Sequence, residues 1–156
     1  MSVEITPQGT RGRRFPRGRL VSLGIRLNVA VYRLLRGRGM DSGMLLLTTV
    51  GARSGAERTV PLAYFPDGSD AWLIIASAGG DARHPAWYRN LAAHPERAAI
   101  EVGGRRVPVR AESLHGADRE ERWRRITAKA KNFAEYQRST DREIPLIRLT
   151  PREPAG

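Results

Sequence analysis

The chain has 156 residues, 40% of them hydrophobic, which is enough for one domain with a core and too few for two ordinary domains. It contains no cysteine and three histidines, which excludes a disulfide framework and thiolate metal sites, and no metal centre is expected. Redox chemistry in this chain would therefore require a bound cofactor.

The positive charge of the chain is concentrated near its N-terminus. The formal net charge is +11, and residues 1–38 carry nine arginines against a single acidic residue, Glu4. The remainder is close to balanced, and its aromatic residues are not interleaved with basic ones as stacking platforms for nucleic acid would be. This distribution predicts a basic arm attached to an ordinary domain and no nucleic-acid partner.

Residues 1–19 lack apolar periodicity and are interrupted by glycine and proline, so we expect a disordered basic arm. Residues 20–38 are predicted to form an amphipathic helix. Its apolar positions are Leu20, Val21, Leu23, Leu27, Val31, Leu34 and Leu35. Arginines interrupt this stretch, which is shorter than the roughly 20 apolar residues of a membrane span. Two alternatives stay open: the apolar side packs on the domain, or residues 11–36 contact an anionic membrane surface.

The pair Arg13-Arg14 before an apolar segment has the form of a twin-arginine export signal. However, Arg26 and Arg33 interrupt that segment, and no small-residue cleavage site follows it, so we reject this interpretation. We expect a cytoplasmic protein that is not secreted, with peripheral contact to the inner membrane face as an open alternative.

From Met44 onward, short apolar segments alternate with turn residues, which is typical of β-strands. The expected strands are residues 44–50, 59–65, 71–77, 98–102, 105–112 and 144–149, and the expected helices are residues 84–93 and 118–131. Residues 66–69 and Gly103-Gly104 are hairpin signals. Short antiparallel strands in a small chain close best as a barrel, because closure removes unpaired edges. We therefore expect a mainly β fold of the α+β class, a small β-barrel with peripheral helices at residues 39–152, and a tail at residues 153–156.

A glycine-rich connection joins the first two expected strands at residues 48–58 and contains Arg53 and Arg58. Glycine lets the backbone approach a ligand, and arginine matches phosphate or carboxylate oxygens. The segment has neither the spacing of a Walker loop nor the helix that follows a dinucleotide fingerprint. Two interpretations stay open: an anion-binding loop, and an ordinary hairpin with solvated arginines.

A second segment of interest, residues 76–80 (Ala-Ser-Ala-Gly-Gly), follows an apolar strand and precedes a helix that contains Trp87. Paired glycines allow a flat ligand to lie against the main chain, and a helix N-terminus favours negative charge. The alternative is a plain strand-to-helix turn with Trp87 in the core. His84, which precedes Pro85 at the helix start, is expected to be a capping or surface histidine.

Several motifs of the chain occur in one specific order. They are residues 45–55, 58, 61–62, 76–80, 85–91, 94–95, 136–137, 140–142 and 144–145. In this order they resemble the deazaflavin-dependent nitroreductase family, over residues 45–150. The resemblance implies a split β-barrel, like that of FMN-binding proteins, which binds reduced coenzyme F420. It also implies hydride transfer to an apolar activated acceptor such as a quinone, an enone or a nitroaromatic.

The resemblance also implies roles for individual residues. Those that match cofactor-binding positions are Ala52, Arg53, Ser54, Gly55, Arg58, Pro61, Ala76, Ser77, Ala78, Gly79, Gly80, Trp87, Tyr88, Asn90 and Leu91. Tyr136 matches a tyrosine on the acceptor side, and the hydroxyl of Ser77 lies where it could hydrogen-bond the ring or the acceptor. These two are the candidate catalytic residues. The alternative for Tyr136 is an ordinary aromatic of an amphipathic helix.

The chain departs from the family pattern at Ala52 and Ala78, where the family often has basic residues. Both departures remove positive charge near the cofactor, which leaves open a weaker affinity for F420, a different contact to its tail, or another flavin. The resemblance implies F420 as the cofactor, and FMN is the alternative. A non-catalytic module that binds F420, a flavin or another anionic ligand is a second hypothesis. Phe133 and Ser139 also depart from the family, so no acceptor preference is carried over.

Overall fold

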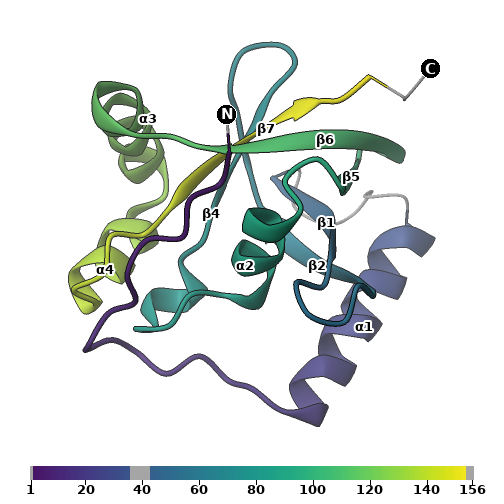
Figure 1. The fold of residues 1–156 in the computed structure, drawn as a ribbon, viewed down its shortest axis with the longest axis horizontal. Coiled ribbons are helices and arrows are strands. Elements are labelled where there is room, and N and C mark those ends of the chain that lie inside the picture. The colour runs from purple at the N-terminus through teal and green to yellow at the C-terminus, as the bar shows by residue number, and fades with distance from the viewer. Residues whose placement is uncertain (1, 36–42, 154–156) are drawn as a thin grey trace.

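The computed structural model describes residues 2–35 and 43–153, which form one antiparallel sheet with helices around it (Figure 1). The strands are β1 (Met44–Val50), β2 (Glu57–Ala63), β3 (Phe65–Pro66), β4 (Trp72–Ile75), β5 (Ala98–Val102), β6 (Arg105–Ser113) and β7 (Leu146–Pro151). The helices are α1 (Arg19–Leu34), α2 (Ala86–Ala93), α3 (Gly116–Lys129) and α4 (Lys131–Ser139), with a 3₁₀ turn, η1, at Ala78–Gly80.

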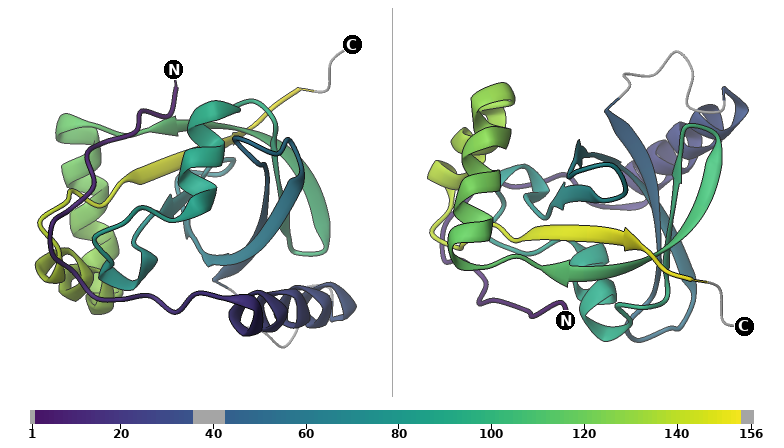
Figure 2. Two further views of the ribbon diagram at one scale, coloured as in Figure 1. Left: turned by 60° about the horizontal axis from the view of Figure 1, so that its bottom comes forward. Right: turned by 90° about the horizontal axis from the view of Figure 1, so that it is seen from above.

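The seven described strands pair in the order β2-β1-β5-β6-β7-β4-β3, and the sheet curls into a half-barrel (Figures 1 and 2). Inward side chains such as Leu45, Ile74 and Ile100 form the main core, and α2 closes it with Tyr88 and Leu91. The helices α3 and α4 cover a second apolar cluster at one end of the sheet, whereas α1 lies at the other end (Figure 2). The predicted mainly β architecture with peripheral helices is confirmed.

The predicted strands agree with the structure to within about two residues at most ends, and both predicted hairpin turns are present. Gly103 and Gly104 have φ values of 58° and 79°, which is the left-handed pair that a two-residue turn between β5 and β6 requires. The expected strand 59–65 is divided into β2 and β3. The expected helix 118–131 is followed by a second helix, α4, because Ala130 leaves the helical conformation with φ −122° and ψ 83°.

The sequence predicted a disordered arm, but in the structure the N-terminal segment, residues 2–18, lies along the body of the domain and forms hydrogen bonds with it. It runs past α4 and η1 before it enters α1 (Figures 1 and 2). The amides of Gly9 and Arg13 donate to the carbonyls of Ala82 and Gly80 at 2.8 and 2.9 Å. A Cβ on Gly12 would lie 2.5 Å from the Gly80 oxygen, so glycine permits this close approach. The arm is therefore held by backbone hydrogen bonds to a distant segment. Such bonds require no apolar periodicity, so the sequence did not indicate them.

A buried polar cluster fastens the same segment to α2. The hydroxyl of Tyr88 donates to the Glu4 carbonyl and accepts from the Thr6 amide. His84 is 1% exposed, and its Nε2 donates to the Thr6 carbonyl at 2.7 Å. Its Nδ1 must then accept from the guanidinium of Arg142 at 3.2 Å, so the imidazole is neutral. The prediction of a capping or surface histidine was wrong, because His84 is a buried link between the arm and the body.

Acidification is expected to destabilise the fold through His84. Burial lowers the pKa of His84, and the neighbouring Arg142 and Arg89 charges lower it further. In the unfolded chain the pKa returns to about 6.5, so unfolding takes up a proton below that pH. The stabilisation is therefore present above pH 6.5 and declines as the pH falls from there towards the lower folded-state pKa. Urea unfolding measured from pH 7.5 to 5.5 should show this decline.

The matched control for this prediction is His84→Gln, which keeps one donor and one acceptor but does not titrate. Its free energy of unfolding should change less over the same pH range. Parallel pH profiles of the two proteins would contradict the assignment of the effect to His84.

The helix α1 packs on the sheet through a face different from the predicted one. Ile25, Val29 and Tyr32 contact Leu46, and the Tyr32 hydroxyl donates towards the carbonyls of Met44 and Glu101. The predicted apolar stripe instead faces outward, with exposed fractions of 85% for Leu20, 63% for Leu23, 66% for Leu27 and 83% for Leu34. The predicted C-terminal end of the helix, at residue 38, lies outside the described residues. No helix in the described part of the chain is long and apolar enough to span a membrane.

Candidate functional site

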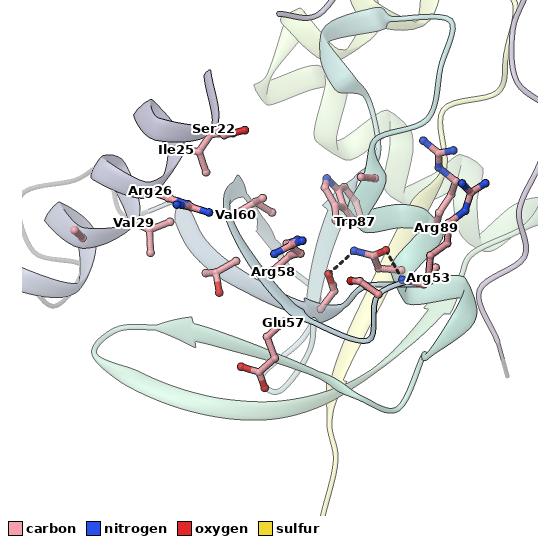
Figure 3. Close-up of a pocket in the computed structure, with 18 of the residues that line it drawn as sticks. Ser22, Ile25, Arg26, Val29, Arg53, Glu57, Arg58, Val60, Trp87 and Arg89 are labelled. Atoms are coloured by element: carbon pink, nitrogen blue, oxygen red, sulfur yellow. Dashed lines mark hydrogen bonds between the residues drawn. The ribbon is translucent and has the colours of Figure 1, made fainter. Parts of the chain in front are cut away.

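A cavity of about 1010 Å³ opens between α1, the β1–β2 connection and α2 (Figure 3). Its lining residues are Ser22, Ile25, Arg26, Val29, Ala30, Arg33, Thr49, Gly51, Ala52, Arg53, Ser54, Glu57, Arg58, Thr59, Val60, Ala86, Trp87, Arg89 and Asn90. Three elements far apart in the sequence therefore contribute to one site, and the predicted helix at the N-terminus forms one of its sides.

The connection between β1 and β2, residues 51–56, is a compact turn held by its own backbone. The Gly51 amide donates to the Ala56 carbonyl at 2.7 Å, and the Gly55 amide donates to the Gly51 carbonyl at 3.0 Å. Gly55 has φ 69°, a conformation that favours glycine. The Ser54 hydroxyl accepts from the Ala56 amide at 3.2 Å. Arg53 lies in this turn and Arg58 follows it in β2, and both line the cavity.

Asn90 on α2 fixes the position of this turn. Its side-chain oxygen accepts from the Ala52 amide, and its amide group donates to the Thr49 hydroxyl, both at 3.0 Å. Asn90 is 8% exposed, so both bonds are largely shielded from water. Asn90 thus supports the loop from behind as well as lining the cavity.

The cavity combines an excess of arginine with an apolar surface. Arg26, Arg53, Arg58 and Arg89 line it, and within residues 2–35 and 43–153 none of them forms an ion pair or a side-chain hydrogen bond. Arg33 differs, because it makes a two-pronged pair with Glu101 at 3.0 and 2.9 Å.

Val29, Val60 and Trp87 contribute apolar side chains to the lining. Figure 3 shows Trp87 and Val60 between α1 and the two arginines at the far end, Arg53 and Arg89. A site with these properties suits a flat ring attached to anionic groups.

The glycine segment, residues 76–80, adopts an unusual backbone conformation but does not line this cavity. Ala78, Gly79 and Gly80 have φ values of 45°, 63° and 88°, and Ala78 has the only positive φ among the described non-glycine residues. Phe15 of the N-terminal segment covers Gly79, since a Cβ there would lie 3.1 Å from its ring. A positive φ at a non-glycine residue such as Ala78 is strained, and strained residues often occur at functional sites. Here the contact between Phe15 and Gly79 also stabilises this conformation.

The structure brings together six of the predicted cofactor-binding residues. These are Ala52, Arg53, Ser54, Arg58, Trp87 and Asn90. Gly55 lies in the same turn. Pro61 lies in β2 opposite Leu46, outside the lining, and the side chains of Ala76, Tyr88 and Leu91 are buried in the core.

The two candidate catalytic residues lie elsewhere. Ser77 is 9% exposed, and its carbonyl accepts from Arg142 at 2.7 Å. Tyr136 on α4 packs edge-on against Phe133 with ring centroids 5.8 Å apart, beneath the guanidinium of Arg13. Its backbone lies against Gly80. Sequence reasoning did not assign Arg26 and Arg89 to the cavity that they line. Arg89 stands between the predicted residues Tyr88 and Asn90, whereas no predicted site residue is next to Arg26.

Solved structures place this half-barrel in a known class. One described as an F420-H2 dependent reductase (FDR-A) is 37% identical with a TM-score of 0.62, covering 69% of this chain and 93% of that chain. Another, described as a domain-swapped dimer, is 31% identical with a TM-score of 0.64, covering 84% of this chain and 99% of that chain. The curled sheet and these similarities define the chain as a split β-barrel, as the sequence predicted.

The family model described as F420H(2)-dependent quinone reductase matches residues 24–151. An F420H(2)-dependent quinone reductase of Mycobacterium tuberculosis is 41% identical over 137 residues, which is 82% of this chain and 90% of that relative. The chain therefore belongs to the F420H(2)-dependent quinone reductase family. Membership confirms the predicted family, the F420-dependent reductase function and coenzyme F420 as the cofactor. It favours an enzyme over a non-catalytic binding module.

Proposed function

We propose that this chain holds reduced F420 in the cavity between α1, β2 and α2 and reduces an apolar acceptor, such as a quinone, an enone or a nitroaromatic. When bound, reduced F420 supplies the hydride. The observation that supports this site is the pairing of an apolar surface, Trp87 and Val60, with four arginines that have no ion pair in the described part of the chain. Such residues fit a cofactor that has a flat ring, a phosphate and an acidic tail.

The residues of the cavity have distinct roles in this proposal. Arg53 and Arg58 bind the anionic tail, and Asn90 positions the turn that carries them through its bonds to Ala52 and Thr49. Trp87 and Val60 orient the ring by contact and keep water from that side. These contacts stabilise the bound ground state and the transition state about equally, so they contribute to the affinity for the cofactor and not to the rate of hydride transfer.

Ser77 and Tyr136 are proposed to serve the acceptor side. The support is their position at the two ends of the glycine segment, together with the motifs that the chain shares with its family. In this role the neutral phenol of Tyr136 donates a proton to the reduced acceptor. Because neither side chain lines the cavity, acceptor binding would have to take place between the cavity and α4.

The cofactor proposal is tested by titrating the purified protein with F420 and with FMN. F420 should bind more tightly, because its acidic tail can engage more of the arginines than the single phosphate of FMN. Equal or tighter binding of FMN would contradict the proposed use of the arginines.

We also propose that α1 contacts an anionic membrane surface from which an apolar acceptor is taken. The support is the outward stripe of Leu20, Leu23, Leu27 and Leu34, which no described residue covers. Arginines flank it at Arg17 and Arg19, and an interfacial helix combines such an apolar face with basic residues. Basic residues near an anionic surface each contribute about 1 kcal/mol to binding.

The double substitution Leu23→Glu and Leu27→Glu is expected to abolish cosedimentation with anionic vesicles at low salt. Both side chains are more than half exposed, so the change should leave the thermal unfolding midpoint close to that of the parent. Ser22→Glu on the cavity side of α1 is the matched control for added charge. Absence of vesicle binding by the parent protein, or unchanged binding by the double variant, would contradict the membrane proposal.

A further inference from the structure

Three of the five arginines that line the cavity come from helices outside the arginine loop, residues 51–58. Arg26 and Arg33 lie on α1 and Arg89 lies on α2, and Arg33 is already paired with Glu101. In Figure 3, Arg26 extends from α1 towards β2, where Arg58 lies, and Arg89 lies with Arg53 at the end of the cavity away from α1. Among the described residues, Glu57 is the only acidic one that lines the cavity. Four like charges around one acid repel one another in the free protein, and a bound polyanion would relieve that repulsion.

We infer that Arg26 and Arg89 are further cofactor-binding residues, which contact the phosphate or the acidic tail of F420 and make α1 part of the cofactor site. This inference rests on the proposed location of F420 in the cavity. In this inference, Arg26 on α1 and Arg89 on α2 provide positive charge to the cofactor, whereas relatives often have basic residues at the positions of Ala52 and Ala78.

The position of Arg26 is fixed by the way α1 packs. Ser22, Arg26, Val29 and Arg33 follow a spacing of three to four residues and form one face of α1, which is the face that lines the cavity. Val29 packs on Leu46, and the pair between Arg33 and Glu101 fastens the next turn to β5. Arg26 is therefore carried by a helix anchored to the sheet, and it is distinct from the outward leucine stripe.

The position of Arg89 follows from its neighbour in the sequence. Asn90 bonds directly to the Ala52 amide, so Arg89 is carried on the turn of α2 that supports the loop. Ala52 itself has only a methyl group to offer a ligand. Arg89 lines the same cavity as Ala52 and lies with Arg53 in Figure 3, so it supplies a guanidinium to the part of the lining where the loop lacks a basic side chain.

The test compares F420 with the same deazaflavin lacking the phosphate and acidic tail, using direct binding measurements at several salt concentrations. Arg26→Ala and Arg89→Ala should each weaken F420 binding about tenfold, which is the loss of one charged hydrogen bond. Each should also reduce the salt dependence of binding, because fewer charges are engaged. Binding of the tail-less deazaflavin should be unchanged. Arg26→Lys and Arg89→Lys should retain much of the salt dependence.

The matched controls are Arg124→Ala on α3 and Arg97→Ala after α2, two exposed arginines outside the lining, and both should bind F420 like the parent. If the parent binds F420 but Arg26→Ala and Arg89→Ala bind it equally well, the inference is overturned and the proposed function stands. Equal loss of affinity for the tail-less deazaflavin would also overturn it, since the arginines would then act on the ring or on the fold. If the parent binds no F420, the proposed function itself fails.

Discussion

Replacing Arg53 and Arg58 together with alanine is expected to raise the dissociation constant of F420 about a hundredfold. Each arginine would lose a charged hydrogen bond worth about 1.5 kcal/mol, and about 1.4 kcal/mol corresponds to a tenfold change. Neither side chain has an ion pair or side-chain hydrogen bond in the described structure, so removing them should leave the fold stable. Titration of the double variant with F420, with thermal unfolding measured alongside, checks both statements.

The matched control for this double variant is the replacement of Arg105 and Arg106 in β6, two exposed arginines of the β5–β6 hairpin. It removes the same charge at positions outside the cavity lining and should bind F420 like the parent. Unchanged affinity of the Arg53 and Arg58 variant at low salt would remove the loop from the cofactor site.

The largest effect on stability is expected from Arg142→Met. Arg142 is 3% exposed, and its guanidinium donates to the carbonyls of Asp81, Ala76 and Ser77 and to the ring of His84, at 2.7 to 3.2 Å. Methionine fills part of the volume but leaves these acceptors unpaired. The free energy of unfolding should fall by about 3 to 5 kcal/mol, as for loss of one partner from a buried charged network.

Urea unfolding of Arg142→Met beside Arg105→Met measures this difference, since Arg105 is exposed and makes no side-chain bond in the described structure. The variant should also lose order in the glycine segment, because three of the broken bonds hold residues 76–81. Equal stability of the two variants would show that the network contributes little.

The strands and turns could be predicted because their signals are local. Residues 44–50 form an apolar run between Gly43 and Gly51, and β1 occupies the same residues. The pair Gly103-Gly104 supplies two left-handed positions in succession, which specify a hairpin without any tertiary information.

The N-terminal segment could not be predicted in the same way. The amides of Gly9 and Arg13 donate to the carbonyls of Ala82 and Gly80, and the amides of Thr10 and Arg11 donate to the Asp141 carboxylate. Every residue type except proline has the same main-chain donor and acceptor, so no composition or periodicity marks such a contact. The helix that follows, α1, has apolar residues around much of its circumference. The sequence alone therefore does not determine whether the side with Leu23 or the side with Val29 packs on the sheet.

The residues that line the cavity could be predicted where they are adjacent in the sequence, but not where the fold joins distant ones. Arg53 and Arg58 stand in one recognisable loop, and Trp87 and Asn90 in one recognisable helix. Arg26 enters the cavity only because Tyr32 and Arg33 fasten α1 beside β5, which is a tertiary fact. His84 was assigned to the surface because its partners, Thr6 and Arg142, lie 78 and 58 residues away.

The central claim, that this chain passes a hydride from reduced F420 to an apolar acceptor, is tested most directly by turnover. Reduced F420 and a water-soluble quinone are mixed with the purified protein, and formation of oxidised F420 is followed against a protein-free control and the Arg53 and Arg58 double variant. The account predicts oxidation in proportion to the parent protein, with a raised KM for F420 in the variant. Tight binding of reduced F420 without any protein-dependent oxidation, across quinone, enone and nitroaromatic acceptors, would contradict it.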